Sequence, residues 1–427
     1  MRGIRVFLTA WLLAAGLAFT SAASAQGTIK IGVLHSLSGT MAISETTLKD
    51  TILMLVDEQN KKGGLLGRKL EAVVVDPASD WPLFAEKARE LLEKDKVAVT
   101  FGCWTSVSRK SVLPVFEKDN GLLFYPVQYE GEESSKNVIY TGAAPNQQAI
   151  PAVDYLMKEV GVKRWVLEGT DYVYPRTTNK ILEAYLKSKG VAAADISINY
   201  TPFGYSDWQT RVANIKKFGS AGKKTAVVST INGDANVPFY KELGNQKISA
   251  EDIPVIAFSV GEEELSGLDA KPLVGHLAAW NYFMSINTPA NKAFIDRWHA
   301  YIKNPKRTTN DPMEAHYIGF NLWVKAVQKA GSTDVDKVLA ALPGLEVPNL
   351  TGGMAKLLPN HHITKPVYIG EVRADGQFDI VSKTGMVPGD AWSDYLPGSK
   401  DIEADWVTLK CGNYNTKTKV CSGQNYK

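Results

Sequence analysis

Short runs of β-branched and apolar residues alternate with amphipathic stretches along most of this chain, at intervals of about thirty residues. Residues 29–34, 70–75 and 97–101 have the composition of buried strands, and the stretches after them carry apolar side chains at helical spacing. Strands that alternate with helices form βαβ units, in which the strands run parallel. The pattern therefore predicts an α/β fold with doubly wound parallel sheets.

The alternating pattern starts twice along the chain. A first series of strands ends near residue 125, a second series occupies 147–258, and long helices at 289–329 precede the last strands. This order predicts two Rossmann-like lobes joined by several crossover strands that serve as hinges. We expect four segments to build them: 28–144 and 284–360 in lobe one, and 145–283 and 361–400 in lobe two.

The first 25 residues have the features of a secretory signal peptide. Arg2 and Arg5 precede an apolar stretch that is too short to span a membrane comfortably, and small residues follow it up to Ala25. We expect cleavage near Ala25 and release of a soluble protein into the periplasm. An uncleaved membrane anchor is the alternative.

The cysteines suggest one disulfide. Cys411 and Cys421 lie in a polar tail at 401–427, and in the oxidising compartment that the signal peptide implies we expect them to pair. Cys103 lies in an apolar stretch, so we expect it to be a buried filler of the core and not a nucleophile. The sequence assigns no function to the tail.

Composition and motifs exclude several classes of function. The formal net charge is +3 and 22% of the residues are charged, with no basic stripe of the kind that binds nucleic acid. His361 and His362 are adjacent on an extended segment, so they point to opposite sides and cannot chelate one metal together. No zinc-protease, phosphate-loop or dinucleotide-binding motif occurs. We therefore predict a binding protein without metal, cofactor or catalytic residues.

Polar and aromatic side chains follow the predicted strands of both lobes. In open α/β sheets ligands bind at the carboxyl ends of the strands, so these loops should face one cleft. Their chemistry suits a small uncharged solute such as urea, a planar molecule with several N–H donors and one strong acceptor. The candidate ligand-binding residues are Ser38, Glu45, Trp104, Thr105, Ser106, Tyr125, Tyr172, Asn232, Asp234, Ser259 and Glu263.

Several candidates also have a purely structural interpretation. Trp104 can pack in the core, and the two tyrosines can be buried with their hydroxyl groups hydrogen-bonded. Ser106 and Asp234 can each cap the helix that follows them, and Glu45 can simply begin a helix. The sequence leaves these alternatives open.

Eight motifs occur in order, at the intervals expected of one protein family. They are LHSLSGTMAISET (34–46), FGCWTSVSRK (101–110), YPVQYEG (125–131), YTGAAPNQQ (140–148), TDYVYPRTTN (170–179), INGDANV (231–237), AAWNYF (278–283) and TNDPMEAHY (309–317). With these motifs the chain resembles the branched-chain amino acid and amide-binding group of the type I periplasmic binding proteins, most closely its urea-transport members. The resemblance runs from about residue 29 to about residue 380.

The resemblance also implies how a ligand is held. Relatives use hydroxyl and aromatic groups of both lobes, which by motif correspond to Trp104, Ser106, Tyr125, Tyr172 and Asp234 here. Amide-sensing relatives have a tyrosine and a threonine where this chain has Trp104 and Val127. The volume of the pocket and one hydroxyl contact are therefore expected to differ.

The function that the resemblance implies is transport. The chain would be a monomeric solute-binding component that delivers urea to the inner-membrane permease subunits of an ATP-binding-cassette (ABC) importer after its lobes close. Short aliphatic amides and branched-chain amino acids are the alternative ligands. A secreted amide hydrolase and a cytoplasmic amide sensor are the alternatives from other classes. The first lacks a recognisable nucleophile motif, and the second disagrees with the signal peptide.

Overall fold

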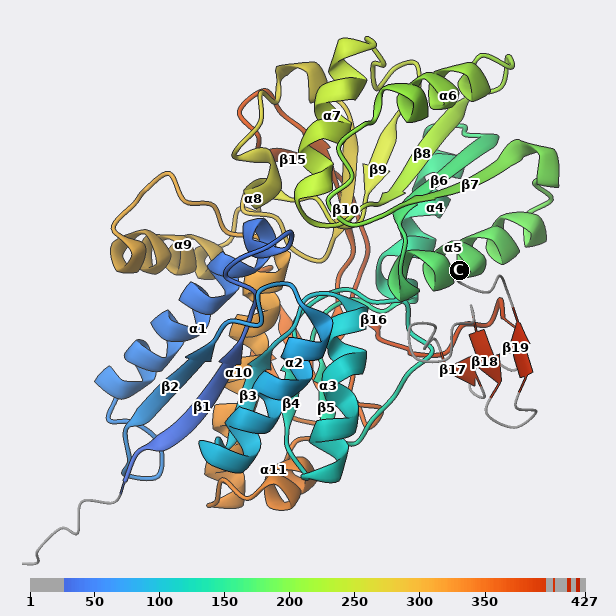
Figure 1. The fold of residues 1–427 in the computed structure, drawn as a ribbon. Helices are drawn as coiled ribbons and strands as arrows, with labels where there is room; N and C mark the ends of the chain where they lie inside the picture. Colours follow the sequence, from blue (N-terminus) through green and yellow to red (C-terminus); the bar gives the residue numbers. More distant parts are fainter. Residues whose placement is uncertain (1–26, 397–401, 404–412, 416–419, 423–427) are drawn as a thin grey trace, which may run out of the picture.

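The computed structural model describes residues 27–396, 402–403, 413–415 and 420–422. Two α/β lobes lie one above the other in Figure 1, and each is built around its own sheet with helices on both sides. The predicted α/β fold is confirmed. The predicted signal peptide lies outside the described residues, and so does Cys411 of the predicted disulfide.

The sheet of lobe one has five parallel strands. Their bounds are β1 Ile29–Leu34, β2 Leu70–Val75, β3 Val99–Gly102, β4 Leu123–Tyr125 and β5 Val138–Tyr140, in the spatial order β2-β1-β3-β4-β5. The helices of this lobe are α1 Ala42–Lys61, α2 Trp81–Arg89, α3 Ser106–Lys118, α9 Pro289–Ile302, α10 Asp311–Ala330 and α11 Val335–Ala341. A short π-helical turn, Glu90–Lys94, continues α2.

The sheet of lobe two has seven strands, of which the first five along the chain are mutually parallel. Their bounds are β6 Arg164–Thr170, β7 Ile196–Thr201, β8 Thr225–Thr230, β9 Val255–Ala257, β10 Leu277–Trp280, β14 Tyr368–Val372 and β15 Phe378–Lys383, in the order β15-β14-β10-β9-β8-β6-β7. The strands β14 and β15 form an antiparallel hairpin at one edge. The helices are α4 Ala149–Lys158, α5 Val173–Ser188, α6 Gln209–Gly219, α7 Asn236–Asn245 and α8 Glu262–Leu265.

In the described residues, connections between the lobes run from β5 to α4, from β10 to α9 and into β14, and after β15 the chain returns toward lobe one, where the carbonyl of Ala391 accepts from the amide of Glu132 (Figure 1). Two small antiparallel sheets accompany the last passage, β11 Glu346–Pro348 with β12 Met354–Lys356, and β13 Thr364–Lys365 with β16 Val387–Pro388. The tail forms a further antiparallel sheet of β17 Ile402–Glu403, β18 Asn413–Asn415 and β19 Val420–Ser422. The predicted lobe boundaries stay a prediction, but several neighbouring connections are the arrangement on which a hinge depends.

Most predicted elements are present within one or two residues, and the differences are local. Strand β5 was not predicted, because its three residues are too few to show a periodicity. The predicted strand 97–101 begins at Val99, since Lys96 has a positive φ of 56° and ends the preceding turn.

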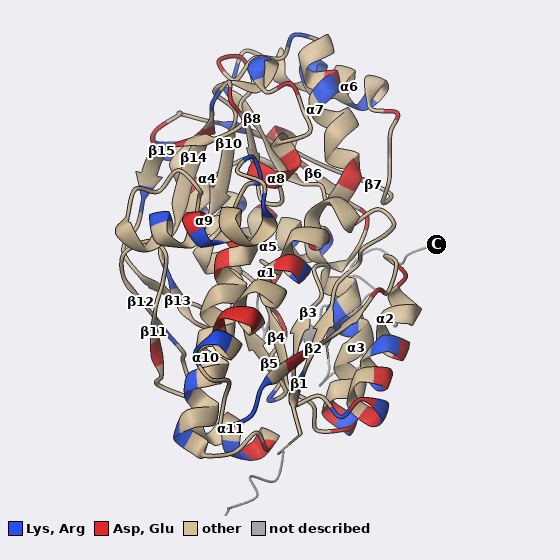
Figure 2. Cartoon of the chain, turned by 90° about the vertical axis from the view of Figure 1, so that its left-hand side faces the viewer, with Lys and Arg blue, Asp and Glu red and all other residues tan. Residues whose placement is uncertain are grey.

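Each lobe has its own apolar core. Phe84, Phe101 and Trp323 are completely buried in lobe one, and Trp165 and Phe239 in lobe two. Within the described ranges, no helix combines the length and the apolar character that a membrane crossing requires. Acidic and basic residues are mixed along the helices on the face drawn in Figure 2.

Candidate ligand-binding site

The loop after β3 brings Trp104 to the surface of lobe one that faces lobe two. Cys103 adopts a positive φ of 65° and turns the chain out of the strand. Thr105 then caps α3, because its hydroxyl accepts a hydrogen bond from the amide of Ser108 at 3.1 Å. The interpretation of Ser106 as the cap of this helix is therefore wrong, and its hydroxyl has other partners.

Side chains from opposite lobes meet directly at this surface. The indole Nε1 of Trp104 donates to Oδ1 of Asn232 at 3.4 Å, and Nε2 of Gln128 donates to the hydroxyl of Ser259 at 2.7 Å. All four residues are at most 3% exposed. Because these contacts join β3 and β4 loops to β8 and β9 loops, the lobes are in a closed arrangement.

Lobe two orients Asn232 through its own strands. The amide of Asn232 donates to the hydroxyl of Thr170 at 2.9 Å, and its Nδ2 donates to the carbonyl of Thr230 at 3.0 Å. The side-chain amide group is therefore turned so that Oδ1 points to lobe one. This carbonyl oxygen is an acceptor at the junction of the lobes.

Two further contacts between the lobes lie beside α1. Ser44 donates through its hydroxyl to Oε1 of Glu264 at 2.7 Å, and the amide of Asp234 donates to the carbonyl of Thr40 at 3.1 Å. Gly233 has a φ of 69°, and a Cβ atom there would lie 2.6 Å from the Thr40 carbonyl oxygen. Only glycine permits this close approach.

Aromatic side chains pack across the junction as well. Tyr172 contacts Phe203 with ring centroids 4.8 Å apart, and Phe203 contacts Trp81 of lobe one at 5.2 Å. Tyr172 and Tyr174 are buried together with Val107 of α3. Burial raises the pKa of both tyrosines, so each hydroxyl is neutral and can donate a hydrogen bond.

Two buried polar atoms in this region are available for a ligand. The hydroxyl of Tyr174 faces Gln128 and Ser259 without forming a well-aligned hydrogen bond to either. Oε1 of Gln128 likewise has no partner in the part of the chain that the structure describes. A buried donor and a buried acceptor without hydrogen-bond partners lower the stability of the closed form, and a bound polar molecule would satisfy both.

A network of charges lies behind the tyrosines. Arg109 is completely buried; its Nε donates to Oε1 of Glu133 at 2.8 Å, and one of its terminal nitrogens reaches Oε1 of Glu130 at 3.3 Å. Ser106 donates its hydroxyl to the other oxygen of Glu130. Lys110 pairs with Glu133 at 2.7 Å, so two cations meet two carboxylates.

Aromatic rings hold the guanidinium of Arg109 in place. Its central carbon lies 4.6 Å from the ring centroid of Tyr125 and 4.7 Å from that of Tyr129. The hydroxyl of Tyr125 donates to the carbonyl of Trp104. Burial raises the pKa of the Glu130 carboxyl group, although the positive charge of Arg109 opposes this shift. At Glu133 burial acts in the same direction, but the charges of Arg109 and Lys110 outweigh it and hold the pKa well below the usual range.

Residues 29–398 match the family model described as a periplasmic binding protein domain. The chain belongs to this family. The prediction that the chain binds its solute without transforming it agrees with membership, and so does the predicted periplasmic location. The resemblance noted from the eight motifs is thus confirmed for the family, while the choice of urea is not tested by it.

Curated relatives of this periplasmic binding protein align over most of their length. Leu/Ile/Val-binding protein homolog 6 of Brucella melitensis is 24% identical over 363 residues, covering 83% of this chain and 90% of the relative. Leu/Ile/Val-binding protein BraC3 of Rhizobium johnstonii is 27% identical over 358 residues, covering 81% and 91%.

Solved structures share the fold. A solute-binding protein of an ABC transporter from Rhodopseudomonas palustris, in complex with p-hydroxybenzoic acid, superposes with a TM-score of 0.73 at 21% identity, covering 86% of this chain and 98% of that one. The leucine-binding protein LivK of Thermotoga maritima gives 0.68 at 18% identity, covering 84% and 99%.

The structure brings most of the predicted site residues of this binding protein to the junction of the lobes. Trp104, Ser106, Tyr125, Tyr172, Asn232 and Ser259 gather there with Thr105, which caps α3. Gln128, Tyr174 and Glu130 join them but were not predicted individually. Their only signal was their position in the motifs YPVQYEG and TDYVYP.

The other predicted residues have partners elsewhere. The hydroxyl of Ser38 donates to Asp76 at 2.9 Å, and Glu263 accepts from Thr308 at 2.7 Å. The carboxylate of Asp234 is exposed, and only its backbone amide contacts lobe one. Their contact with a ligand stays a prediction.

Glu45 lies inside lobe one and is completely buried. Its Oε2 accepts from the amide of Ser36 at 2.8 Å and lies 3.1 Å from Nδ1 of His35. Nε2 of His35 is in turn 2.8 Å from Nε2 of His316. Burial is the main cause that raises the pKa of Glu45. This carboxyl group therefore anchors the start of α1 to β1 and α10.

His361 and His362 do not face a common position that a metal ion could occupy. Nε2 of His362 lies 2.6 Å from the hydroxyl of Tyr129, whereas Nδ1 of His361 faces the carbonyls of Ser135 and Val138. Among the described residues, no group of three or more metal-binding side chains occurs.

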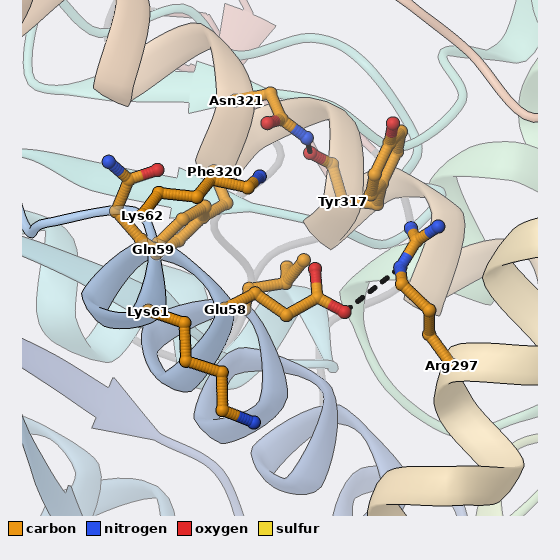
Figure 3. Close-up of a pocket in the computed structure, with 9 residues that line it drawn as sticks. Glu58, Gln59, Lys61, Lys62, Arg297, Tyr317, Phe320 and Asn321 are labelled. Atoms are coloured by element: carbon orange, nitrogen blue, oxygen red, sulfur yellow. Dashed lines mark hydrogen bonds and ion pairs between the residues drawn. The ribbon is translucent and has the colours of Figure 1, made fainter.

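An open hollow of about 500 Å³ lies away from the junction, between α1, α9 and α10 (Figure 3). Glu58 and Arg297 form an ion pair across it at 2.9 Å. Lys61 and Lys62 lie at its edge, and Tyr317 lies in its wall. None of the described residues that line this hollow takes part in the contacts between the lobes.

Proposed function

We propose that this protein is the periplasmic solute-binding component of an ABC importer and that it captures urea by closure of its two lobes. One observation carries the choice of ligand. Gln128 and Ser259 approach to 2.7 Å across the junction, and Trp104 and Asn232 to 3.4 Å. Opposed side chains that touch limit the space between the lobes, which favours a small ligand, and urea is smaller than any amino acid.

The chemistry of the junction also matches urea. Its carbonyl oxygen can accept from the hydroxyl of Tyr174, and its N–H groups can donate to Oε1 of Gln128 and Oδ1 of Asn232. The indole of Trp104 supplies a flat wall for a planar molecule. Ser106 and Tyr172 lie next to these groups and complete the proposed site.

The cations near the site favour a ligand without a carboxylate. Arg109 and Lys110 are already paired with Glu130 and Glu133. A branched-chain amino acid would bring its own carboxylate and would need an unpaired cationic side chain to bind it. Such a ligand is nevertheless the second candidate, because curated relatives are named Leu/Ile/Val-binding proteins. Short aliphatic amides need no cation and are the nearest alternatives to urea.

The expected affinity is modest. Urea has only four heavy atoms, and at a ceiling of about 1.5 kcal/mol for each the binding free energy reaches about 6 kcal/mol, or a Kd on the order of tens of micromolar. The closed form would be the one that the permease subunits recognise, so release would follow lobe opening. We expect the protein to act as a monomer.

Calorimetry with urea, formamide, acetamide and leucine tests the proposal. We expect heat from urea at micromolar to millimolar concentrations, weaker heat from the two amides, and none from leucine. Heat from leucine but not from urea would contradict the choice of ligand and leave the transport role intact. Quantitative recovery of unchanged urea after incubation would exclude hydrolysis.

A further inference from the structure

The first turn of α3 is the natural place for an anion in this cleft, yet a carboxylate of the chain already lies against it. Helix N-termini attract anions through their free N–H groups. Here Glu130 accepts from the hydroxyl of Ser106 and from the guanidinium of Arg109, both in the first turns of α3. Glu130 and Ser106 are at most 1% exposed.

Glu130 is also tied to the loop that meets lobe two. Ser106, which donates to Glu130, follows Trp104 by two residues, and Trp104 contacts Asn232 of lobe two at 3.4 Å. Glu133, by contrast, accepts from Lys110 at 2.7 Å and from the hydroxyl of Tyr140 at 2.7 Å, and neither of these groups contacts lobe two in the described contacts. Of these two carboxylates, Glu130 is therefore the one next to a ligand.

We propose that Glu130 is a specificity-determining residue that excludes solutes carrying a carboxylate, because its own carboxylate occupies the Ser106 and Arg109 donors at the start of α3. This inference rests on the proposed function, the binding of urea or a related neutral amide. A carboxylate in the closed cleft would meet a like charge within a buried space and would find both donors engaged. A neutral amide meets neither obstacle and can donate N–H bonds to the lone pairs that remain on Glu130.

Acetamide and acetate are the probes that test this inference, since they have nearly the same shape and differ in charge. We expect native protein to bind acetamide at least tenfold more tightly than acetate at pH 7.5. Glu130→Gln keeps the shape and the partner of Ser106 but removes the negative charge. The ratio of the two Kd values should fall at least tenfold in this variant, through tighter binding of acetate.

Glu133→Gln is the matched control, since it removes a negative charge from the same guanidinium but keeps the carboxylate that accepts from Ser106. Its Kd ratio should stay within about threefold of the native ratio, because the bonds of Ser106 and Arg109 to Glu130 stay in place. Circular dichroism establishes whether each variant is folded. Should Glu130→Gln fail to fold, Glu130→Ala removes the same charge and leaves Arg109 paired with Glu133. It should show the same fall.

The outcomes separate the two proposals. Native protein that binds acetamide and rejects acetate, with an unchanged ratio in the folded Glu130 variant, would overturn the inference and leave the proposed function standing. An equal fall in both the Glu130 and Glu133 variants would also overturn it, because the effect would then be one of overall charge. Native protein that binds leucine or acetate in preference to urea and acetamide would overturn both.

Discussion

Ser44→Ala should weaken urea binding, because it removes a hydrogen bond that forms between the lobes. The hydroxyl of Ser44 on α1 lies 2.7 Å from Oε1 of Glu264 on α8, and both side chains are buried. In an open form both groups would be hydrated. The bond therefore contributes to the free energy of closure, and through closure to the affinity for the ligand.

The expected magnitude follows from the partners. A hydrogen bond to an ionised group contributes about 1.5–3 kcal/mol, which corresponds to roughly 10- to 150-fold in affinity. Burial raises the pKa of Glu264, and this reduces the assistance that its charge gives to the bond. We therefore expect the lower end of the range, a Kd about tenfold weaker than native.

Titration calorimetry of native protein, Ser44→Ala and a control gives the answer. Thr51→Val is the control, because the hydroxyl of Thr51 is also buried on α1 but donates to the Thr47 carbonyl of the same helix at 2.8 Å. Closure does not change that bond, so its affinity should stay within about threefold of native. A Ser44→Ala affinity within twofold of native, or an equal loss in both variants, would refute the reasoning.

Three further predictions concern the site and the stability of the fold. Trp104→Ala should weaken urea binding, measured by calorimetry, more than about tenfold, since one wall of the proposed site and the contact with Asn232 are lost. The affinity lost in Trp104→Ala should exceed that lost in Asp234→Ala, because the carboxylate of Asp234 is exposed. Phe101→Ala should lower the free energy of unfolding by about 3–5 kcal/mol in guanidinium chloride, because the ring is completely buried between Phe124 and Trp323; a loss below about 1 kcal/mol would contradict this packing. Burial raises the pKa of Glu168 to about 7, so the folded state holds this proton more tightly than the unfolded state and stability falls as the pH rises from about 4.5 through 7. The native protein loses roughly 3 kcal/mol in this way, whereas Glu168→Gln has no carboxyl group to titrate. The free energy of unfolding of the variant minus that of the native protein should therefore increase across this pH range, and a difference that stays constant would show that the carboxyl group titrates normally.

The sequence predicted the fold well, because both lobes use long elements with clear periodicity. The bounds of β1 and β2 coincide with the predicted strands, and α9 and α10 occupy the predicted helical region 289–329 to within one residue at each end. The strand β5 and the π-helical turn at Glu90–Lys94 were missed. Their geometry depends on neighbouring strands and on packing, which no local pattern contains.

The site was predictable at the level of loops and less so at the level of side chains. Every loop that meets at the junction follows a predicted strand, so the rule for parallel sheets located them. The direction of each side chain was not accessible, since Asp234 and Asn232 are two residues apart and only Asn232 points into the junction. The contact between Gln128 and Ser259 joins residues 131 positions apart, and only the folded chain brings them together.

The burial of Cys103 bears on how this protein survives in an oxidising compartment. The thiol is completely buried, as the sequence predicted, and burial raises its pKa far above that of a free cysteine. Thiol–disulfide exchange proceeds through the thiolate, so the sulfur of Cys103 does not react as long as the end of β3 stays folded. Maleimide labelling of Cys103 would therefore count the molecules whose first lobe has locally unravelled.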